Sequence, residues 1–434
     1  EVAKNIARAL KAEMTNDDIT RLNKTMTTHP DAYELLLKIK STNFTNRKEV
    51  LIREEVLKKV VLLDPESAYA FAKLGGIHSW IYFYGMDRTK ERLRMAKDAL
   101  DRSLDLDPLS ATVHVELGFY YYSAFLDFEK GLKKYEIAKR LDPNDPDINW
   151  RISLILRRQG KFKESFELMK KCFDLDPKNN IYPDQLIMMT SYLGLSEIFD
   201  EYFDIATELG MDATTGLIYK VIEKYGRGGS LVAYKDIVED ASKIAHDTWF
   251  HIFIAEYYRV IKNYELSLLH IDKVRDEDHN LQTQYLSKEY LRGIIYKKMN
   301  QEDRSNSFFE EALVDVEKQL KNAVDDPRFL ASKGKILAYL GENEKAIKYG
   351  KMATDIVSVD NDKLQGVDYN YDLAKIYSIC GEFEEAVTEI KKIQNVQPNM
   401  AIVGFLTNDA EFSNIQKYPG FRRLINDYKQ EQGI

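Results

Sequence analysis

The sequence predicts an all-α solenoid of stacked antiparallel helix pairs. The tripeptide Leu-Asp-Pro occurs four times in the first 180 residues, with its prolines at Pro65, Pro108, Pro143 and Pro177, and the last three lie 35 and 34 residues apart. A phrase that returns at this period between helical segments is typical of repeat solenoids. Pro and Gly are scarce, 10 and 21 among 434 residues, which argues against a fold of many strands and tight turns.

The composition limits the kinds of ligand and of location. The net charge of −8 argues against general phosphate binding, which needs a clustered excess of Lys and Arg. The sequence shows neither an apolar run long enough for a membrane span nor a signal peptide. It opens on Glu1 with a helical pattern already under way, so we expect a processed part of a longer protein with a possible regulatory module upstream. A cytoplasmic location is favoured, and a periplasmic one is possible if an anchor lies upstream.

The stretch from Asp145 to Pro177 shows one complete repeat. Asp145 can cap a helix whose first position is Pro146, where a missing N–H costs nothing. Gly160 can supply the left-handed turn at the end of that helix. Phe162 then begins a second helix, which ends before Pro177. The order helix, turn, helix, proline is the repeating unit that the sequence predicts.

This stretch resembles the tetratricopeptide repeat, in which a large residue and Leu-Gly are followed by a turn and by small and aromatic residues. Matching residues in four more copies are Phe71, Leu74, Gly75, Ala96 and Leu100; Leu117, Gly118, Tyr121, Tyr135 and Ala138; Gly334, Gly341, Ala346 and Ala353; and Leu373, Ala374, Tyr377, Gly381, Phe383, Ala386 and Pro398. Weaker copies contain Ala255, Tyr258, Tyr264 and Ser267, and Gly293, Tyr296, Phe309 and Ala312. The resemblance implies a right-handed superhelix that binds rather than catalyses.

The quality of the repeat signal divides the chain into five segments. Residues 1–64 contain N-terminal helices and a degenerate first repeat, and residues 65–178 form an N-terminal array. Residues 179–246 hold two helix pairs with poor repeat signatures and breaks near Gly194, Gly210 and Gly226. Residues 247–400 form a C-terminal array, and residues 401–434 a capping segment, because a terminal repeat must cover its exposed face.

The two ends of the chain carry a second, shorter resemblance. The tail, with Leu406, Asp409, Phe412 and Pro419, resembles the closing segment of bacterial repeat proteins. In those proteins the array follows a cyclase, kinase, winged-helix or TolB-like module, and the opening around Val2 resembles the junction before the array. The resemblance implies a bacterial regulatory or scaffold protein.

The first helix of each pair lines the inner groove in this family, so its groove positions give candidate binding residues. They are Trp80, Phe119, Tyr122, Trp150, Arg157, Arg158, Trp249, Glu256, Arg259, Tyr290, Lys297, Lys335, Tyr371 and Lys375. Arg and Lys hold carboxylates by charge-assisted contacts, and aromatic planes add contact area at low entropy cost. We therefore predict that the groove binds a peptide or protein segment that is acidic or ends in a free carboxylate. The alternative is that the aromatics pack between repeats and the cations are solvated. The Lys/Asn/Arg clamp of chaperone-binding members is not matched.

Other features predict neither catalysis nor a cofactor. The glycine-rich stretch from Gly226 to Ser230 has no preceding strand and no following lysine, so it predicts a helix–helix turn. The seven histidines are dispersed without metal-ligand spacing, and Cys172 and Cys380 fit buried reduced thiols. Two alternatives stay open: an enzyme on a helical-repeat scaffold, and an RNA reader. The reader needs a basic groove along the array, and the acidic charge weighs against nucleic acid.

Overall fold

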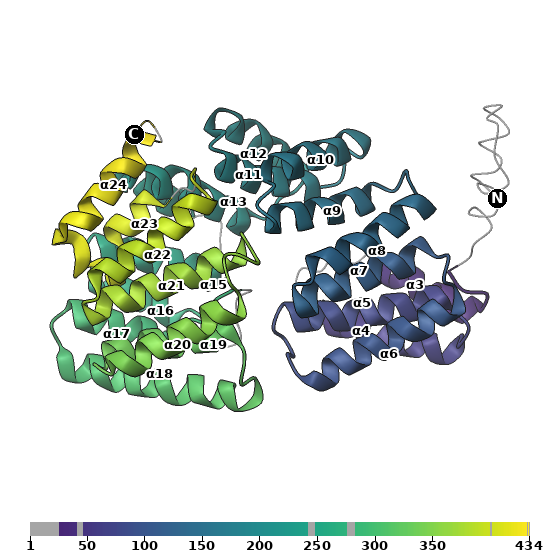
Figure 1. Ribbon diagram of the computed structural model, residues 1–434, viewed down its shortest axis with the longest axis horizontal. Coiled ribbons are helices and arrows are strands. Elements are labelled where there is room, and N and C mark those ends of the chain that lie inside the picture. Colours follow the sequence, from purple (N-terminus) through teal and green to yellow (C-terminus); the bar gives the residue numbers. More distant parts are fainter. Residues whose placement is uncertain are drawn as a thin grey trace. The chain divides into compact units, whose positions relative to one another are not determined.

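The computed structural model describes residues 26–40, 47–241, 248–275, 283–399, 402–431 and 433. The regular elements in these ranges are all helices, stacked as antiparallel pairs (Figure 1). The predicted all-α solenoid is therefore confirmed. The helices predicted at the start of segment 1–64 lie outside the described residues, as does the side chain of Trp249.

Each helix pair consists of two elements that are consecutive in the chain. The first pairs are α3 (Pro30–Lys40) with α4 (Arg47–Leu63), α5 (Ala68–Phe83) with α6 (Lys90–Leu106), α7 (Ala111–Phe125) with α8 (Phe128–Leu141), α9 (Pro146–Arg158) with α10 (Phe162–Leu175), and α11 (Ile181–Leu193) with α12 (Phe199–Glu208). The later pairs are α15 (Thr248–Val260) with α16 (Tyr264–Asp272), α17 (Lys288–Lys298) with α18 (Glu302–Asn322), α19 (Pro327–Tyr339) with α20 (Asn343–Ile356), and α21 (Gln365–Cys380) with α22 (Phe383–Val396).

The Leu-Asp-Pro phrases end helices, as predicted. The leucines Leu106, Leu141 and Leu175 are the last residues of α6, α8 and α10. The aspartate that follows is extended each time, with φ near −140° and ψ near 80° for Asp142. A residue before proline is pushed out of the helical region by the proline ring, so the phrase stops the helix locally.

The glycines of the repeat pattern allow the two helices of a pair to approach closely. A Cβ on Gly118 of α7 would lie 2.4 Å from the ring of Tyr135 in α8. A Cβ on Gly293 of α17 would likewise lie 2.7 Å from the ring of Phe309 in α18. These contacts show why the same position is small in successive copies.

The glycine-rich stretch from Gly226 to Ser230 includes a turn, but the helix before it ends later than the predicted break near Gly226. Helix α13 (Ala213–Lys220) continues as a π-helix, η2 (Val221–Gly226), and the turn follows before α14 (Leu231–Ala241). Gly229, with φ of +72°, adopts the left-handed conformation that glycine tolerates, rather than Gly226. The turn is therefore confirmed as a helix–helix connection.

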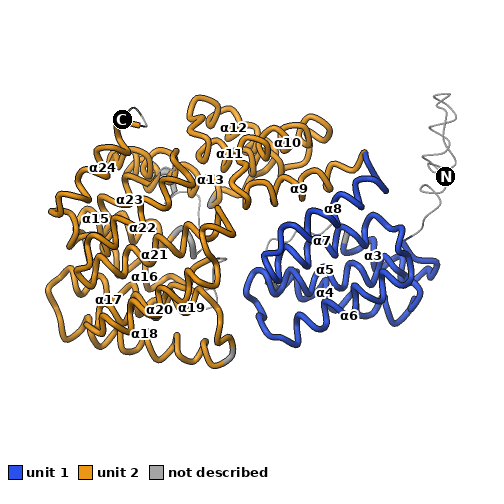
Figure 2. The backbone as a smooth tube through the Cα atoms, viewed as in Figure 1, with its two compact units in different colours: residues 1–143 blue, residues 144–434 orange. Residues whose placement is uncertain are grey.

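The chain divides into two compact units, residues 1–143 and residues 144–434 (Figure 2). Unit 1 contains α3 to α8, and its cores form between neighbouring pairs. Unit 2 contains the remaining helices, ending in α23 (Val403–Asn408), the short helices η4 (Ala410–Phe412) and η5 (Ile415–Lys417), and α24 (Pro419–Glu431). The five segments inferred from repeat quality stay predictions about the strength of the sequence signal.

The first helix of unit 2, α9, contacts the loop that precedes α21. Arg158 at the end of α9 forms an ion pair of 2.6 Å with Asp362, and its carbonyl accepts a hydrogen bond of 2.8 Å from the backbone N–H of Lys363. Tyr225 of η2 donates a 3.3 Å hydrogen bond to the carbonyl of Gly404 in α23. Both contacts thus join segments of unit 2 that are far apart in the sequence.

Candidate functional site

Five of the predicted groove residues converge in unit 2. Arg259 comes from α15, Tyr290 from α17, Lys335 from α19, and both Tyr371 and Lys375 from α21. They surround the segment 408–411, which runs from the last residue of α23 into η4. We call these five residues and this segment the inner cluster.

The acidic side chains of the segment contact the groove residues directly. Lys375 Nζ lies 2.8 Å from a carboxylate oxygen of Asp409 and 3.9 Å from one of Glu411. The hydroxyl of Tyr290 donates a 2.8 Å hydrogen bond to Glu411, and the hydroxyl of Tyr371 donates a 3.4 Å bond to Asp409. The groove residues that the sequence predicts to hold an acidic segment thus hold one that belongs to the same chain.

Two cations also contact the main chain of the segment. Arg259 Nη2 donates a 2.5 Å hydrogen bond to the carbonyl of Asn408, the last residue of α23. Lys298 Nζ donates a 3.3 Å hydrogen bond to the carbonyl of Ala410. A helix C-terminus carries partial negative charge, so Arg259 is favourably placed at the end of α23. The sequence predicts Lys297 as the groove residue of α17. In the structure Lys297 pairs with Glu302 at 2.7 Å, and its neighbour Lys298 contacts the carbonyl of Ala410.

A buried ion pair completes the inner cluster. Lys335 is 2% exposed, and its Nζ lies 2.8 Å from Asp372 and 5.7 Å from the ring centre of Tyr290. The ammonium of Lys375 stands 4.8 Å from the ring centre of Tyr371. Buried charges are costly unless they are paired, and here each cation has both a carboxylate and an aromatic face.

Burial separates the pKa values of the two acids in the segment. Burial, followed by the charge of Asp409, raises the pKa of Glu411 to about 7. Burial alone would also raise the pKa of Asp409, but the adjacent Lys375 ammonium outweighs it and holds that pKa well below the usual range. Asp409 therefore carries the charge, and Glu411 takes up a proton as the pH falls through about 7.

A cavity of about 170 Å³ adjoins the inner cluster. Its apolar wall comes from Ile252, Phe253, Leu286, Ile294 and Phe405, among other side chains. Its polar end comprises residues of the inner cluster together with Glu256, which pairs with Arg259. An apolar pocket with a few convergent polar groups is the usual form of a small-ligand site.

The first helices of unit 2 supply a second part of the inner face. Trp150 and Arg157 lie seven residues apart on α9 and therefore on the same side of that helix. Arg157 donates a 2.8 Å hydrogen bond to Gln185 of α11, yet its Nε and the indole N–H of Trp150 are buried without an acceptor among the described residues. Nearby, burial raises the pKa of Asp184, against hydrogen bonds from Tyr219 and Gln185. The predicted Arg158 does not face this side, because its guanidinium pairs with Asp362.

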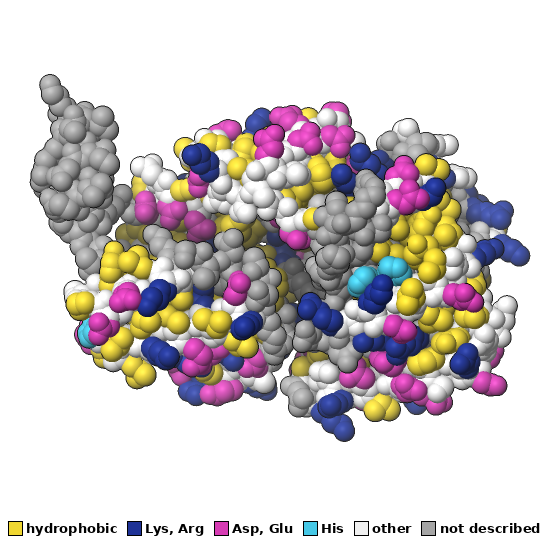
Figure 3. All heavy atoms as spheres, turned by 180° about the vertical axis from the view of Figure 1, so that it is seen from behind, with side chains coloured by type: hydrophobic (Ala, Val, Ile, Leu, Met, Phe, Trp, Pro, Cys, Tyr) yellow, Lys and Arg dark blue, Asp and Glu magenta, His cyan; other side chains and the backbone are white. Residues whose placement is uncertain are grey.

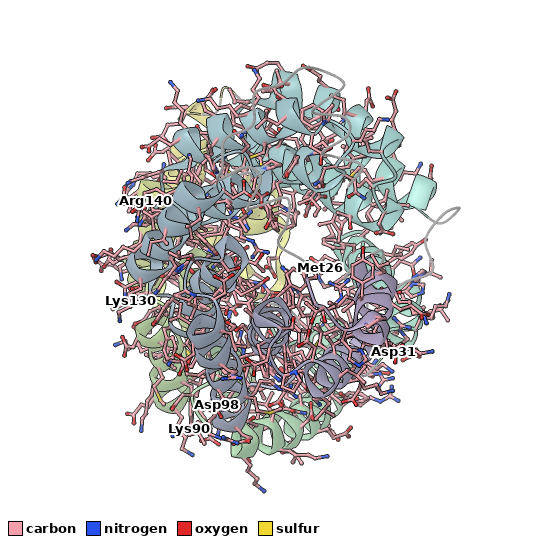
Figure 4. All side chains as sticks on the ribbon, turned by 90° about the vertical axis from the view of Figure 1, so that its right-hand side faces the viewer. Met26, Asp31, Lys90, Asp98, Lys130 and Arg140 are labelled. Atoms are coloured by element: carbon pink, nitrogen blue, oxygen red, sulfur yellow. The ribbon has the colours of Figure 1, made fainter. Side chains whose placement is uncertain are left out.

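The predicted residues of unit 1 pack in an aromatic cluster. Tyr122 is 3% exposed, and its ring centre lies 5.6 Å from that of Phe83 and 6.1 Å from that of Phe119. Trp80 stacks on Tyr84 at 4.1 Å. The charged residues labelled in Figure 4, such as Asp98 on α6 and Lys130 on α8, are exposed at the edge of unit 1. Phe119 and Tyr122 thus have the contacts of packing residues.

The other candidate chemistry of the sequence finds little support in the described ranges. There, no group of three or more His, Cys, Asp and Glu side chains is placed to hold a metal ion, and no helix is long and apolar enough to cross a membrane. Neither cysteine forms a disulfide with a described residue; Cys172 is buried and Cys380 only partly so. On the face shown in Figure 3, Lys and Arg side chains are interspersed with Asp and Glu.

The helix pairs agree with the family comparison. A sequence profile of the tetratricopeptide repeat matches residues 146–179 and 367–400, which comprise α9 with α10 and α21 with α22. The chain contains tetratricopeptide repeats. Such repeats stack into extended concave binding surfaces, so the chain has the build of a protein-interaction or scaffold module. Among curated proteins, none matches the sequence.

Three solved structures are similar to the chain at low identity. The human IFIT1 dimer with PPP-AAAA is 16% identical with a TM-score of 0.42, covering 82% of this chain and 76% of that one. YrrB, a tetratricopeptide repeat protein with an unusual peptide-binding site, is 17% identical with a TM-score of 0.28, covering 53% and 96%. PilF of Pseudomonas aeruginosa is 14% identical with a TM-score of 0.30, covering 57% and 90%.

Sequence reasoning missed the acids of the inner cluster. Asp409 and Glu411 were interpreted as part of a terminal cap, and Asp372 was not considered. The signal in the sequence is weak: two acids, spaced by one residue, stand between the apolar Leu406 and Phe412. Both apolar residues are fully buried, which is what commits the acids between them to the interior.

Proposed function

We propose that the inner face of unit 2 binds an acidic segment or a free C-terminus of a partner protein, and that the chain is the non-catalytic interaction part of a larger bacterial regulatory or scaffold protein. The observation that supports this most is the inner cluster. There, cations and tyrosines from three helices, α15, α17 and α21, hold the carboxylates and carbonyls of the segment 408–411.

The part of this face that remains for a partner is the side formed by α9 and α11. The cations of the inner cluster already have carboxylates, whereas Arg157 Nε and Trp150 Nε1 have no acceptor among the described residues. A buried donor without an acceptor costs free energy, so a ligand that brings an acceptor is favoured there. Carboxylates and backbone carbonyls of an extended segment are such acceptors.

The partner's context follows from the ends of the sequence. Their resemblance to bacterial repeat proteins makes a cyclase, kinase, winged-helix or TolB-like module the first candidate for what the array regulates. A partner segment bound along α9 and α11 would contact α9. This helix is joined to the loop before α21, near the end of the array, by the ion pair of Arg158 and Asp362. Binding would then be transmitted through a contact that closes unit 2.

The test compares Arg157→Glu with Lys170→Glu, which reverses an exposed charge on the neighbouring α10. We expect a fluorescein-labelled peptide rich in Asp and Glu to bind wild type more tightly than its Asn and Gln counterpart. Arg157→Glu should weaken that binding at least tenfold, and Lys170→Glu should leave it unchanged, as measured by fluorescence anisotropy. Equal binding of the acidic peptide by all three proteins would remove this side of unit 2 as the site.

A further inference from the structure

We infer that the cavity beside the inner cluster binds a small carboxylic acid with an apolar body. This site is separate from the face of α9 and α11 and does not depend on a protein partner. It lies between α15, α16, α17 and the segment 405–411, all within unit 2. Its two ends differ in chemistry, and each end specifies one half of the ligand.

The apolar end sets the size of the ligand body. An engineered apolar cavity of about 150 Å³ in another protein holds one benzene molecule. The cavity here has about 170 Å³ and is lined at this end by Phe253, Leu286, Ile294 and Phe405. It therefore suits a single ring or a short branched chain rather than a long acyl chain.

The charged end favours an acceptor group on the ligand. Arg259, Lys335 and Lys375 all line the cavity. An ammonium has three N–H donors, yet Lys335 Nζ has one carboxylate partner, Asp372, among the described residues. The guanidinium of Arg259 bonds through Nε and Nη2 to Glu256 and Asn408, and its Nη1 has no acceptor in that part of the chain. Buried donors of this kind bind a carboxylate by charge-assisted hydrogen bonds.

The charge balance of the site favours an anion over an amine. Three cations line the cavity, Arg259, Lys335 and Lys375, and they pair with the carboxylates of Glu256, Asp372 and Asp409. The fourth acid, Glu411, is held beside Asp409, and burial with this like charge raises its pKa to about 7. With Glu411 protonated, these charges balance, so no unpaired carboxylate remains to bind an amine, whereas the remaining N–H groups of Lys335 and Arg259 can donate to a ligand carboxylate.

The experiment titrates the intact chain with benzoate, benzamide and benzylamine at pH 6.5 and follows binding by calorimetry and by saturation-transfer NMR. We expect benzoate to bind at least tenfold more tightly than the neutral amide or the amine. Leu286→Trp, which fills the cavity, should abolish benzoate binding, whereas Leu269→Trp at an exposed position of α16 should not change it. Equal binding of the three probes, or benzoate binding that survives Leu286→Trp, overturns the inference.

A second variant keeps the test decisive if Leu286→Trp fails to fold. Glu411→Gln preserves the shape of the side chain and removes its titration. Wild type should lose benzoate affinity severalfold between pH 6 and pH 8, and Glu411→Gln should not; parallel pH profiles would contradict the site. N-acetyl-Ala-Ala-Phe with a free carboxylate serves as the peptide arm. If this peptide binds tighter than benzoate while its amide does not bind, the cavity accepts a peptide C-terminus and the assignment to a free acid is wrong.

Discussion

The two units carry groove-position residues of the same repeat pattern in different surroundings. In unit 1, Phe119 and Tyr122 pack against each other and against Phe83, and this aromatic cluster needs no further partner. In unit 2, Lys335 and Lys375 are buried at such positions and require carboxylates. The acids come from within α21 and from the segment after α23. The difference teaches that the side chains at these positions, rather than the helix pairs, decide whether the inner face is filled by packed rings or by ion pairs.

The largest expected effect comes from breaking the ion pair that joins α9 to the loop before α21. Arg158→Met leaves Asp362 buried without its cation, so we expect the free energy of unfolding of unit 2 to fall by about 3–5 kcal/mol. The control in unit 1 is Arg102→Met, which removes an exposed pair with Glu66 and should cost less than about 1 kcal/mol. Denaturant unfolding of both variants measures the difference. Similar costs for the two variants would contradict the closure of unit 2 by Arg158.

The aromatic cluster of unit 1 should behave as a core. Tyr122→Ala removes a ring that is 3% exposed, and we expect it to destabilise unit 1 by about 3 kcal/mol through the cavity that it leaves. Amide hydrogen exchange should rise in α5 and α7 and remain unchanged in α15 to α21. An unchanged exchange rate in α5 and α7 would instead favour the prediction that Tyr122 is a surface binding residue.

A smaller effect depends on pH and belongs to unit 2 alone. The pKa of Glu411 is raised to about 7, so the folded chain retains a proton that the unfolded chain releases above its ordinary pKa of 4.5. The resulting stabilisation is complete below pH 4.5 and is lost as the pH rises through 7. Relative to Glu411→Gln, wild type should therefore lose about 2 kcal/mol between pH 5 and pH 8. Chemical denaturation at the two pH values tests this, and a constant difference between the proteins would mean that Glu411 titrates normally.

The smallest effect concerns the contact of α23 with η2. A Cβ on Gly404 would lie 2.2 Å from the carbonyl oxygen of Tyr225, and a backbone atom cannot move aside cheaply. We expect Gly404→Ala to lower the free energy of unfolding of unit 2 by about 1–2 kcal/mol, as measured by thermal unfolding. Gly216→Ala, on α13, meets the flexible end of Met211 at 3.1 Å and should be neutral or slightly stabilising. Equal stability of the two variants would show that this close approach is not needed.

Local features of the fold could be predicted from the sequence, and the site could be predicted in part. The proline of each Leu-Asp-Pro phrase restricts the residue before it, so the ends of α6, α8 and α10 follow from neighbouring residues. The inner position of Arg259, Tyr290, Lys335 and Lys375 follows from which helix of each pair faces inward. One residue of helix register separates Lys297 from Lys298, and no repeat pattern resolves it.

The contact of Glu411 with Tyr290 could not be predicted, because the two residues are distant in the chain. The hydrogen bond between Tyr290 and Glu411 joins residues 121 positions apart, and it depends on the curvature of unit 2 through several repeats. Curvature is the sum of small rotations between repeats, which the individual motifs do not encode. For the same reason, the ion pair of Arg158 and Asp362, which are 204 positions apart, could not be predicted from the sequence.

We propose above all that the inner face of unit 2 binds carboxylates, and a pair of double-mutant cycles tests this most directly. One cycle combines Lys375→Met with Asp409→Asn in unit 2, and the other combines Lys130→Met with Asp127→Asn at an exposed pair of unit 1. We expect a coupling energy above about 2 kcal/mol for the buried pair of Lys375 and Asp409 and below about 0.5 kcal/mol for the exposed pair of Lys130 and Asp127. Coupling energies below about 0.5 kcal/mol in both cycles would contradict it.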